Sequence, residues 1–270
     1  MSGDRLATCL FFCSVLLAPE TTLAQQPSLP PGSETTWIVE GAEEIIAHFA
    51  FDAEPMSARL PEGMTFLTLA ELSSMGNEKA QTYLAANPDQ AEWGVSFLEI
   101  VRQEVFEIDG RSPTLPGDGA FALWFAGVKP ATGSDLSPGR LALELWVPDA
   151  EYAEYMRERG HYASYGDVQL TDGEDGVWRG SVEIDNLRVA ASCLAGEESR
   201  SLGPGNQLVY PRADAKVGSV VRAVYAGHME RSCTTDNWQL SGTHPLATAS
   251  RIGQGVFQFG YTLRGGAYPE

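Results

Sequence analysis

Four histidines are the side chains of this sequence whose charge changes most readily near neutral pH, so they are the first candidates for proton transfer. They are His48, His161, His228 and His244, and their spacing is not that of a metal-binding motif. His228 and Glu230 would share one face of a strand, but no third ligand accompanies them. We therefore predict no metal and no cofactor. His161 is kept as a candidate acid or base, with a structural histidine as the alternative.

The motifs with the strongest chemical meaning are absent. The sequence has no G-x-S-x-G, Walker, dinucleotide-glycine, H-E-x-x-H or C-x-x-C pattern. Lysine occurs only at Lys79, Lys129 and Lys216, whereas arginine supplies fifteen of the eighteen cations. An anionic ligand is therefore expected to be held by arginine, whose planar guanidinium fits a carboxylate.

The charge balance excludes some partners. The formal net charge is -18, with 36 acidic residues against 18 basic ones. Nucleic acids and anionic lipids are bound through Lys and Arg at their phosphates, so neither is an expected partner. The simplest reading of the acidity is solubility. A small anionic or carbonyl-containing ligand remains the expected partner, and the oligomeric state is not predicted.

The N-terminal segment has the pattern of a secretory signal. Arg5 precedes the apolar run LATCLFFCSVLLA, and a small-residue site follows, which predicts cleavage after Ala24. The run is too short to span a bilayer. Cys9, which follows Leu-Ala-Thr, is an alternative signal for lipidation. The predicted location is therefore the periplasm or the secreted fraction.

The expected mature chain begins with a polar, proline-rich tether over 25–36, and 37–270 is predicted to form a single domain. Two cysteines remain after cleavage, Cys193 and Cys233. An oxidising compartment predicts that they form a disulfide. Two buried thiols or a thiol nucleophile are the alternatives.

The elements that position these residues can be predicted from periodicity and turn signals. Residues 33–51 begin with cap-type side chains and predict a short helix, and a second helix is expected from Thr68 to Asn87. After Trp93, branched and aromatic segments separated by Gly and Asp turns predict strands. A helix over 149–160 interrupts them. The expected fold class is α+β, a largely antiparallel β-barrel or cone-like sheet with a few short peripheral helices.

Four phrases of the sequence carry a resemblance to a known family. They are FDAEPMSARLPEGMTFLTLAEL (51–72), RLALELWVPD (140–149), MRERGHYASYGDVQL (156–170) and GVWRGSVEIDNLRVAASCL (176–194). In order and texture they resemble acetoacetate decarboxylase-like proteins, and a later phrase, DNWQLSGTHPLA, echoes that family's late strand and turn. The resemblance spans most of the expected mature chain.

The resemblance implies an enzyme scaffold without its reactive amine. Active decarboxylases of the family form a Schiff base between a lysine and the substrate ketone. The matching turn here, ASYGD, has no lysine, and none occurs between Lys129 and Lys216. Decarboxylation by the family mechanism is therefore expected to be lost, because Lys129 lies at the end of an earlier strand.

The resemblance also implies roles for two charged side chains. Arg59 stands in the phrase where the family places a substrate-binding arginine, with a surface arginine as the alternative. Glu107 is the best match to the family's proton-handling acid, and Glu99 and Glu104 are rivals. Alternation puts Glu99 on the face of Glu107 only if no bulge intervenes. The alternative for each glutamate is a solvated strand face.

Aromatic residues complete the predicted site. His161 and Tyr165 flank the turn that lacks the lysine and are the candidate acid and base. Trp124 is a candidate substrate-binding residue, although Trp124 and Trp146 also suit a hydrophobic core.

Two classes of function follow from this reading. The first is an exported enzyme, lyase-like, that acts on a small oxo acid without a Schiff base. The second is a non-catalytic ligand-binding or structural protein. The interior of the barrel separates them, because a site would be open and lined by Arg and Glu, whereas a structural core would be filled by Trp and Tyr.

Overall fold

The computed structural model describes residues 35–114, 119–132, 138–202, 205–210, 221–225 and 228–267. The expected signal sequence over 1–24 lies outside the described residues, and the first strand begins at Thr35, within the expected tether. Strands dominate the described residues and the helices are short, so the predicted α+β class is confirmed. No helix among the described residues is long and apolar enough to cross a membrane.

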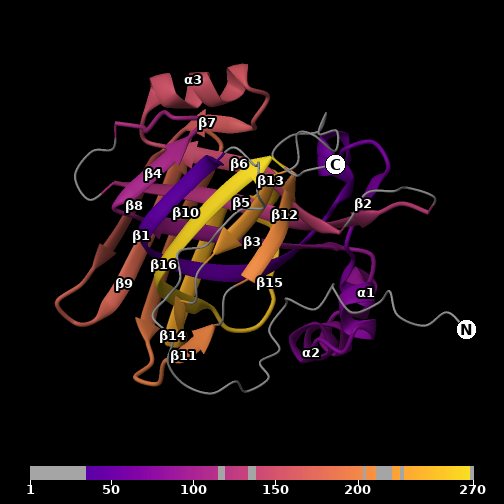
Figure 1. Cartoon of the computed structure of the whole chain (residues 1–270). Helices are drawn as coiled ribbons and strands as arrows, with labels where there is room; N and C mark the ends of the chain where they lie inside the picture. Colours follow the sequence, from indigo (N-terminus) through magenta and orange to yellow (C-terminus); the bar gives the residue numbers. More distant parts are fainter. Residues whose placement is uncertain are drawn as a thin grey trace, which may run out of the picture.

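Part of the sheet forms a closed ring of strands (Figure 1). Its strands are β1 (Thr35–Phe51), β3 (Gly94–Arg102), β5 (Ala120–Pro130), β6 (Gly139–Val147), β12 (Gly205–Tyr210), β13 (Val221–Tyr225) and β16 (Val256–Ala267). They pair in this order, and β16 pairs again with β1, which closes the ring. The neighbours are antiparallel except β6 and β12, which are parallel.

The inside of the ring is identified by the side chains that meet there. One buried cluster takes a member from six of these strands: Ile46, Phe97, Phe125, Val209, Ala223 and Val256. The seventh strand, β6, adds the partly buried Ala142. Side chains alternate between the two faces of a strand, so every second residue around these positions points into the ring.

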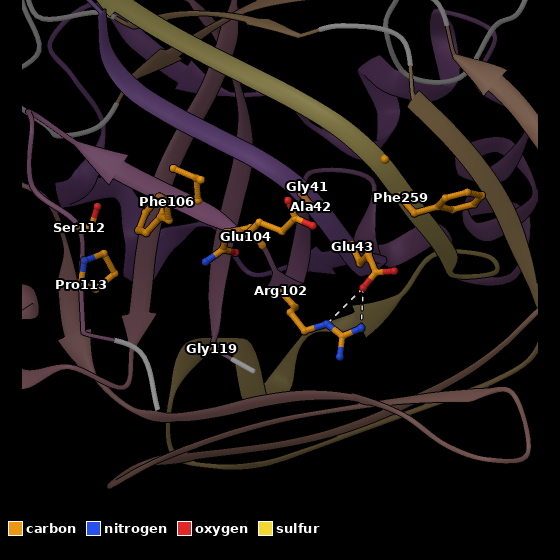
Figure 2. A pocket seen from close by; sticks show the side chains of 13 residues that line it. Gly41, Ala42, Glu43, Arg102, Glu104, Phe106, Ser112, Pro113, Gly119 and Phe259 are labelled. Atoms are coloured by element: carbon orange, nitrogen blue, oxygen red, sulfur yellow. Dashed lines mark hydrogen bonds and ion pairs between the residues drawn. The ribbon is translucent and has the colours of Figure 1, made fainter. Parts of the chain in front are cut away.

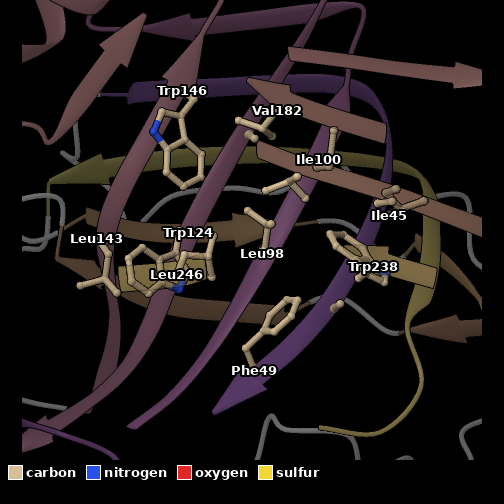
Figure 3. Close-up of a cluster of buried hydrophobic side chains, with 14 of the residues drawn as sticks. Ile45, Phe49, Leu98, Ile100, Trp124, Leu143, Trp146, Val182, Trp238 and Leu246 are labelled. Carbon is tan, nitrogen blue, oxygen red and sulfur yellow. The ribbon is translucent and has the colours of Figure 1, made fainter. Parts of the chain in front are cut away.

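A second layer of strands packs against the outside of the ring. It consists of β8 (Asp167–Asp172), β9 (Val177–Ile184), β10 (Leu187–Ala195) and β14 (His228–Gly242) and continues from β16. The largest hydrophobic cluster lies between the layers, with Trp124 and Trp146 fully buried (Figure 3). A Cβ at Gly180 would come within 2.8 Å of Ile45 Cδ1 and 2.9 Å of Ile100 Cδ1, so the layers are in direct contact there.

Three short helices cover the ends of the ring. Tyr152 and Met156 of α3 (Ala150–Glu158) pack against Val101, whereas α1 (Leu69–Ser74) and α2 (Glu78–Ala86) pack near Val95, at the other end of β3. The expected caps of α3 are present. Asp149 accepts a hydrogen bond from Tyr152 N at 2.9 Å, and Gly160 follows with φ 81°.

Smaller elements complete the chain. They are η1 (Glu54–Arg59), β2 (Met64–Phe66), η2 (Pro88–Gln90), β4 (Val105–Ile108), β7 (Ala163–Tyr165), β11 (Arg200–Leu202), η4 (Pro245–Thr248) and β15 (Ser250–Arg251).

The prediction of a helix within 33–51 was wrong. This segment is β1, which pairs with β3 on one side and β16 on the other. Both of its edges are therefore paired, and both of its faces are covered as well, because Ile45 and Ile46 are buried in clusters on opposite sides. A strand buried on both faces loses the polar–apolar alternation that marks a strand, so periodicity cannot separate it from a helix.

The second predicted helix is two helices. Thr68 caps α1 as expected, and Asn87 ends α2 as expected. Gly76, at φ 89°, separates the two, and Asn77 caps the second by accepting from Ala80 N. The glycine takes a conformation that most side chains avoid, which is why the helix does not run through.

The predicted disulfide is confirmed. Cys193 of β10 and Cys233 of β14 are joined, with their Cα atoms 5.1 Å apart, and both are buried in the inter-sheet core. The link connects two strands that already pair.

Replacing both cysteines by serine is expected to lower the free energy of unfolding by about 2–4 kcal/mol, because the open chain gains conformational freedom. Chemical denaturation of the two proteins measures this difference. Thiol titration of the denatured, unreduced protein should find neither Cys193 nor Cys233 free, and two titratable thiols at these positions would contradict the pairing.

Candidate functional site

Glu99 is one of the acidic side chains that the fold places inside the ring. It lies on β3 opposite Ile46 of β1 and Leu123 of β5. Its neighbours Leu98 and Ile100 belong to the inter-sheet core, whereas Phe97, two positions away, belongs to the ring interior. By alternation the Glu99 side chain therefore points into the ring.

Arg140 is the cation next to Glu99. Its Nη1 lies 3.7 Å from Glu99 Oε1, and its guanidinium lies over the Phe97 ring, 4.2 Å from the centroid. The side chains of Glu99 and Arg140 are 13% and 27% exposed. Water-sized molecules therefore reach this pair, although it lies within the ring of strands.

The carboxyl of Glu99 is poised to exchange a proton near neutral pH. Burial raises its pKa to about 7, and the charge of Arg140 opposes only part of that rise. A carboxyl with this pKa is present in both the acid and the base form at neutral pH. Those are the properties of a general acid–base group.

His48 completes the group. It lies opposite Phe97 on the same face of β1 as Ile46, with its ring centroid 6.2 Å from that of Phe97. Burial, together with the positive charges of Lys79, Arg140 and Arg251, lowers the pKa of His48 to about 3. At neutral pH it is therefore an uncharged imidazole. We refer to Glu99, Arg140, His48 and Phe97 as the ring-interior cluster.

The raised pKa of Glu99 predicts a pH dependence of stability. The folded pKa of about 7 exceeds the usual 4.5, so the folded protein binds more protons between these values. The contribution of Glu99 to the free energy of unfolding is fully present below about pH 4.5 and is lost as the pH rises through 7. Relative to Glu99→Gln, the wild-type free energy of unfolding should fall by about 2–3 kcal/mol from pH 4 to pH 8.

Denaturation of the wild type and of Glu99→Gln across this pH range measures the difference. The lowered pKa of His48 makes the free energy of unfolding rise with pH, but His48 is present in both proteins. A difference that does not change with pH would contradict the raised pKa.

A second polar group lies at the edge of the inter-sheet core. Arg59, the last residue of η1, donates to Glu144 Oε1 at 2.7 Å and to the backbone carbonyl of Leu143. Its guanidinium also lies over the Tyr162 ring, 4.3 Å from the centroid. On the other side, His244 Nε2 lies 3.3 Å from the same carboxyl oxygen of Glu144.

The geometry of this second group is that of a structural joint. His244 Nδ1 accepts from Leu246 N at 3.1 Å, so the ring proton sits on Nε2 and is donated to Glu144. Burial alone would raise the pKa of Glu144, but the hydrogen bond from His244 and the charge of Arg59 bring it below its usual range. Glu144 thus fastens η1 and the start of η4 to β6.

Arg59 was predicted to hold the carboxylate of a ligand. In the structure its guanidinium pairs with a carboxylate of the protein itself, that of Glu144. Glu107 is half-buried on β4, on the face opposite Phe106 and Ile108, whose side chains pack under α3. Gln103 and Glu104 lie between β3 and β4 outside both strands, so the alternation is interrupted. Glu107 lies opposite Ile38 of β1 and Glu99 lies opposite Ile46 of the same strand, so the two glutamates are not brought together.

The other predicted site residues lie in three different surroundings. His161 is half-buried, with its ring 6.4 Å from that of Trp37, and Tyr165 is 58% exposed. Trp124 is fully buried between the layers, edge-on to the His244 ring.

Lys129 is far from Glu99 along the sheet. It pairs with Glu71 of α1. It also lies six residues beyond Leu123, the partner of Glu99 on β5, which corresponds to about 20 Å of strand. Its amine is therefore held at the α1 end of the ring.

Comparisons with known proteins give a likeness in fold. No family model matches the chain, and no curated protein matches it. The enduracididine biosynthesis enzyme MppR, in complex with the condensation product of pyruvate and imidazole 4-carboxaldehyde, is 14% identical, with 89% of each chain covered and a TM-score of 0.47. An acetoacetate decarboxylase-like enzyme from Sphingomonas wittichii RW1 is 12% identical, with 88% of this chain and 94% of that chain covered and a TM-score of 0.46.

An acetoacetate decarboxylase gives 12% identity, 88% of each chain covered and a TM-score of 0.46. These likenesses concern the fold alone, and they assign no role to any residue of this chain.

Proposed function

We propose that the chain binds a small oxo acid in the ring and moves a proton at the carbon next to its carbonyl group, without a Schiff base. The observation that carries this proposal is the Glu99 carboxyl, which has a pKa of about 7 and lies 3.7 Å from the Arg140 guanidinium inside the ring. A carboxyl at the midpoint of its titration can both take and return a proton at neutral pH.

Glu99, Arg140 and His48 of the ring-interior cluster each have a part in this step. The Glu99 carboxylate removes a proton from the carbon, and the electron pair of that C–H bond moves to the carbonyl oxygen, giving an enolate. Arg140 stabilises the negative charge, because a guanidinium carries five donors and its contact with Glu99 uses one edge. Protonated Glu99 then returns a proton to the carbon. Neutral His48 adds no competing positive charge.

The test is hydrogen–deuterium exchange of small oxo acids in heavy water. Pyruvate, 2-oxobutyrate and acetoacetate each have hydrogens next to a carbonyl group. We expect the protein to speed the loss of that proton signal in the NMR spectrum of at least one of them above the rate in buffer. Equal rates with and without protein for all three would contradict the proposal.

No imine should form during this reaction. Lys129 is paired with Glu71 at the α1 end of the ring, and Lys79 on α2 donates to the backbone carbonyl of Gln254, so each of these two amines has a partner other than Glu99. Borohydride added in the presence of acetoacetate is therefore expected to leave the mass of the protein unchanged. A trapped adduct on Lys129 would contradict this and would return the function to amine chemistry.

A non-catalytic protein is the second candidate, and the filling of the inter-sheet core favours it. Trp124, Trp146 and Phe49 are fully buried there, as expected of a structural core. Binding of an oxo acid by calorimetry without any proton exchange would support a binding protein, and neither binding nor exchange would support a structural one.

Export is part of the proposal in either case. The signal-like residues 1–24 support it, and the joined cysteines fit an oxidising compartment. The single domain over 37–270 likewise stays a prediction.

A further inference from the structure

Apolar side chains flank Glu99 inside the ring. Ile46 of β1 and Leu123 of β5 lie directly opposite Glu99 on the two neighbouring strands. Residues that lie opposite each other on antiparallel strands have Cβ atoms about 4.5–5.5 Å apart. A carbon that gives its proton to the Glu99 carboxyl therefore lies next to hydrocarbon side chains, and so do the groups attached to that carbon.

Leu123 belongs to a set of apolar side chains that lie between two buried clusters. Leu123, Trp37 and Leu263 each pack against the cluster that contains Phe97 and Phe125 and against the cluster under α3. The members of the two clusters are buried, whereas these three side chains are only half-buried. They leave open hydrocarbon surface that a bound apolar group would cover, which is favourable because both surfaces then lose contact with water.

The charges of the ring interior favour a ligand with one carboxylate over a ligand with two. Arg140 supplies the positive charge beside Glu99. Glu44 lies two residues before Ile46 on β1, shares its face and is only 3% exposed, so it adds an acidic group and no cation. His48, two residues beyond Ile46, is uncharged at neutral pH. A second carboxylate would therefore lie among apolar and acidic side chains.

The wide hollow of about 860 Å³ near the end of β3 is a different surface (Figure 2). Glu43 and Arg102 line it and share the faces of Ile45 and Ile100, which point away from the ring interior. Arg102 donates to Glu43 at 2.6 Å and 3.2 Å and contacts Asp172 at 3.5 Å. Its charge is already matched by these carboxylates, so the hollow does not suit the carboxylate of an oxo acid.

We infer that the ligand of the ring is a 2-oxo acid with an uncharged, apolar side chain, and that Leu123 contacts that side chain. The inference rests on the proposed function, whose substrate class it names. In a 2-oxo acid the carboxylate adjoins the carbonyl group, so the single guanidinium of Arg140 can donate to oxygens of both. The rest of the molecule then faces the hydrocarbon surface beside Glu99.

The first experiment measures the binding of three oxo acids to the wild type by calorimetry. 5-Methyl-2-oxohexanoate and 2-oxoglutarate are a matched pair, because an isopropyl group in the first stands where the second has a carboxylate. Pyruvate lacks the side chain. We expect 5-methyl-2-oxohexanoate to bind at least about tenfold more tightly than either of the others. Equal or tighter binding of 2-oxoglutarate or pyruvate, or no binding of 5-methyl-2-oxohexanoate, would overturn the inference.

The second experiment tests the contact with Leu123. Leu123→Ala is expected to weaken the binding of 5-methyl-2-oxohexanoate by about tenfold and that of pyruvate by less than about threefold. Leu240→Ala is the matched control, because Leu240 of β14 is also half-buried but packs against the inter-sheet core. Equal weakening of both ligands in Leu123→Ala, or an equal loss in Leu240→Ala, would overturn the role of Leu123. The order of ligands on the wild type decides the substrate class even if a variant does not fold.

Proton exchange in heavy water separates this inference from the proposed function. The hydrogens next to the carbonyl group should exchange faster in 5-methyl-2-oxohexanoate than in 2-oxoglutarate. Faster exchange of 2-oxoglutarate would overturn the inference and leave the proposed function standing. Tightest binding of 5-methyl-2-oxohexanoate without exchange of any oxo acid would support the ligand class and overturn the proposed proton transfer.

Discussion

Replacing Glu99 by glutamine is expected to slow the exchange of the proton next to the oxo-acid carbonyl by about 10²–10⁴-fold. The substitution keeps the shape of the side chain beside Arg140 but removes the group that takes and returns the proton. The fold should survive, because a neutral glutamine is easier to bury than a carboxylate. The NMR exchange rate in heavy water, measured at saturating oxo acid, gives the ratio directly.

Glu107→Gln is the competing variant. Glu107 was the stronger candidate from the sequence, but it lies on β4, on the face turned away from the residues packed under α3. We expect Glu107→Gln to change the exchange rate by less than about threefold. Loss of exchange in Glu107→Gln with normal exchange in Glu99→Gln would move the role to Glu107.

Replacing Glu144 by alanine is expected to lower the free energy of unfolding by about 3–5 kcal/mol. The change removes the shared acceptor of Arg59 and His244 and leaves both groups without their carboxylate. It also releases η1 and the start of η4 from β6. Because Arg59 is 26% exposed, water compensates part of its loss, which favours the lower end of the range. Urea denaturation measures the difference.

Glu183→Ala is the matched control. Glu183 forms an ion pair of similar length with Arg188, at 2.9 Å, but both side chains are exposed. Its removal should cost at most about 1 kcal/mol. Equal losses for the two alanine variants would show that the Glu144 group is not a structural joint.

Much of the fold follows from local signals. The Asp109–Gly110 turn after β4 has both residues at positive φ, as its Asp-Gly sequence predicts. Asp149 and Gly160 bound α3 as expected. The local sequence pattern predicted a helix at β1 and was wrong there. Pairing with β3 and β16 decides the conformation of this segment, and its own pattern does not.

The candidate site could be predicted only in part. Glu99 could be named only as a rival of Glu107, because alternation puts it on the face of Phe97 but does not show that this face points into the ring. Arg140 and His48 could not, since they meet Glu99 only through the pairing of β1, β3, β5 and β6.

The partner of Arg59 could likewise not be predicted from the sequence. Glu144 lies 85 residues further along the chain and is brought close by the position of η1 against β6. The register between β5 and β6 also shifts, because Trp124 and Phe125 face Glu144 and Ala142 and leave Leu143 of β6 as the extra residue, which upsets the alternation that would place Glu144.

The central claim is that the ring holds a carboxyl ready to exchange protons at neutral pH. The most direct measurement is an NMR titration of the glutamate side-chain carboxyl carbons, with the Glu99 signal assigned by its absence in Glu99→Gln. The account predicts a midpoint near pH 7 for Glu99, because burial raises its pKa. A midpoint near the usual value of about 4.5 would contradict it, because the carboxyl would then be a plain carboxylate at neutral pH with little tendency to take a proton.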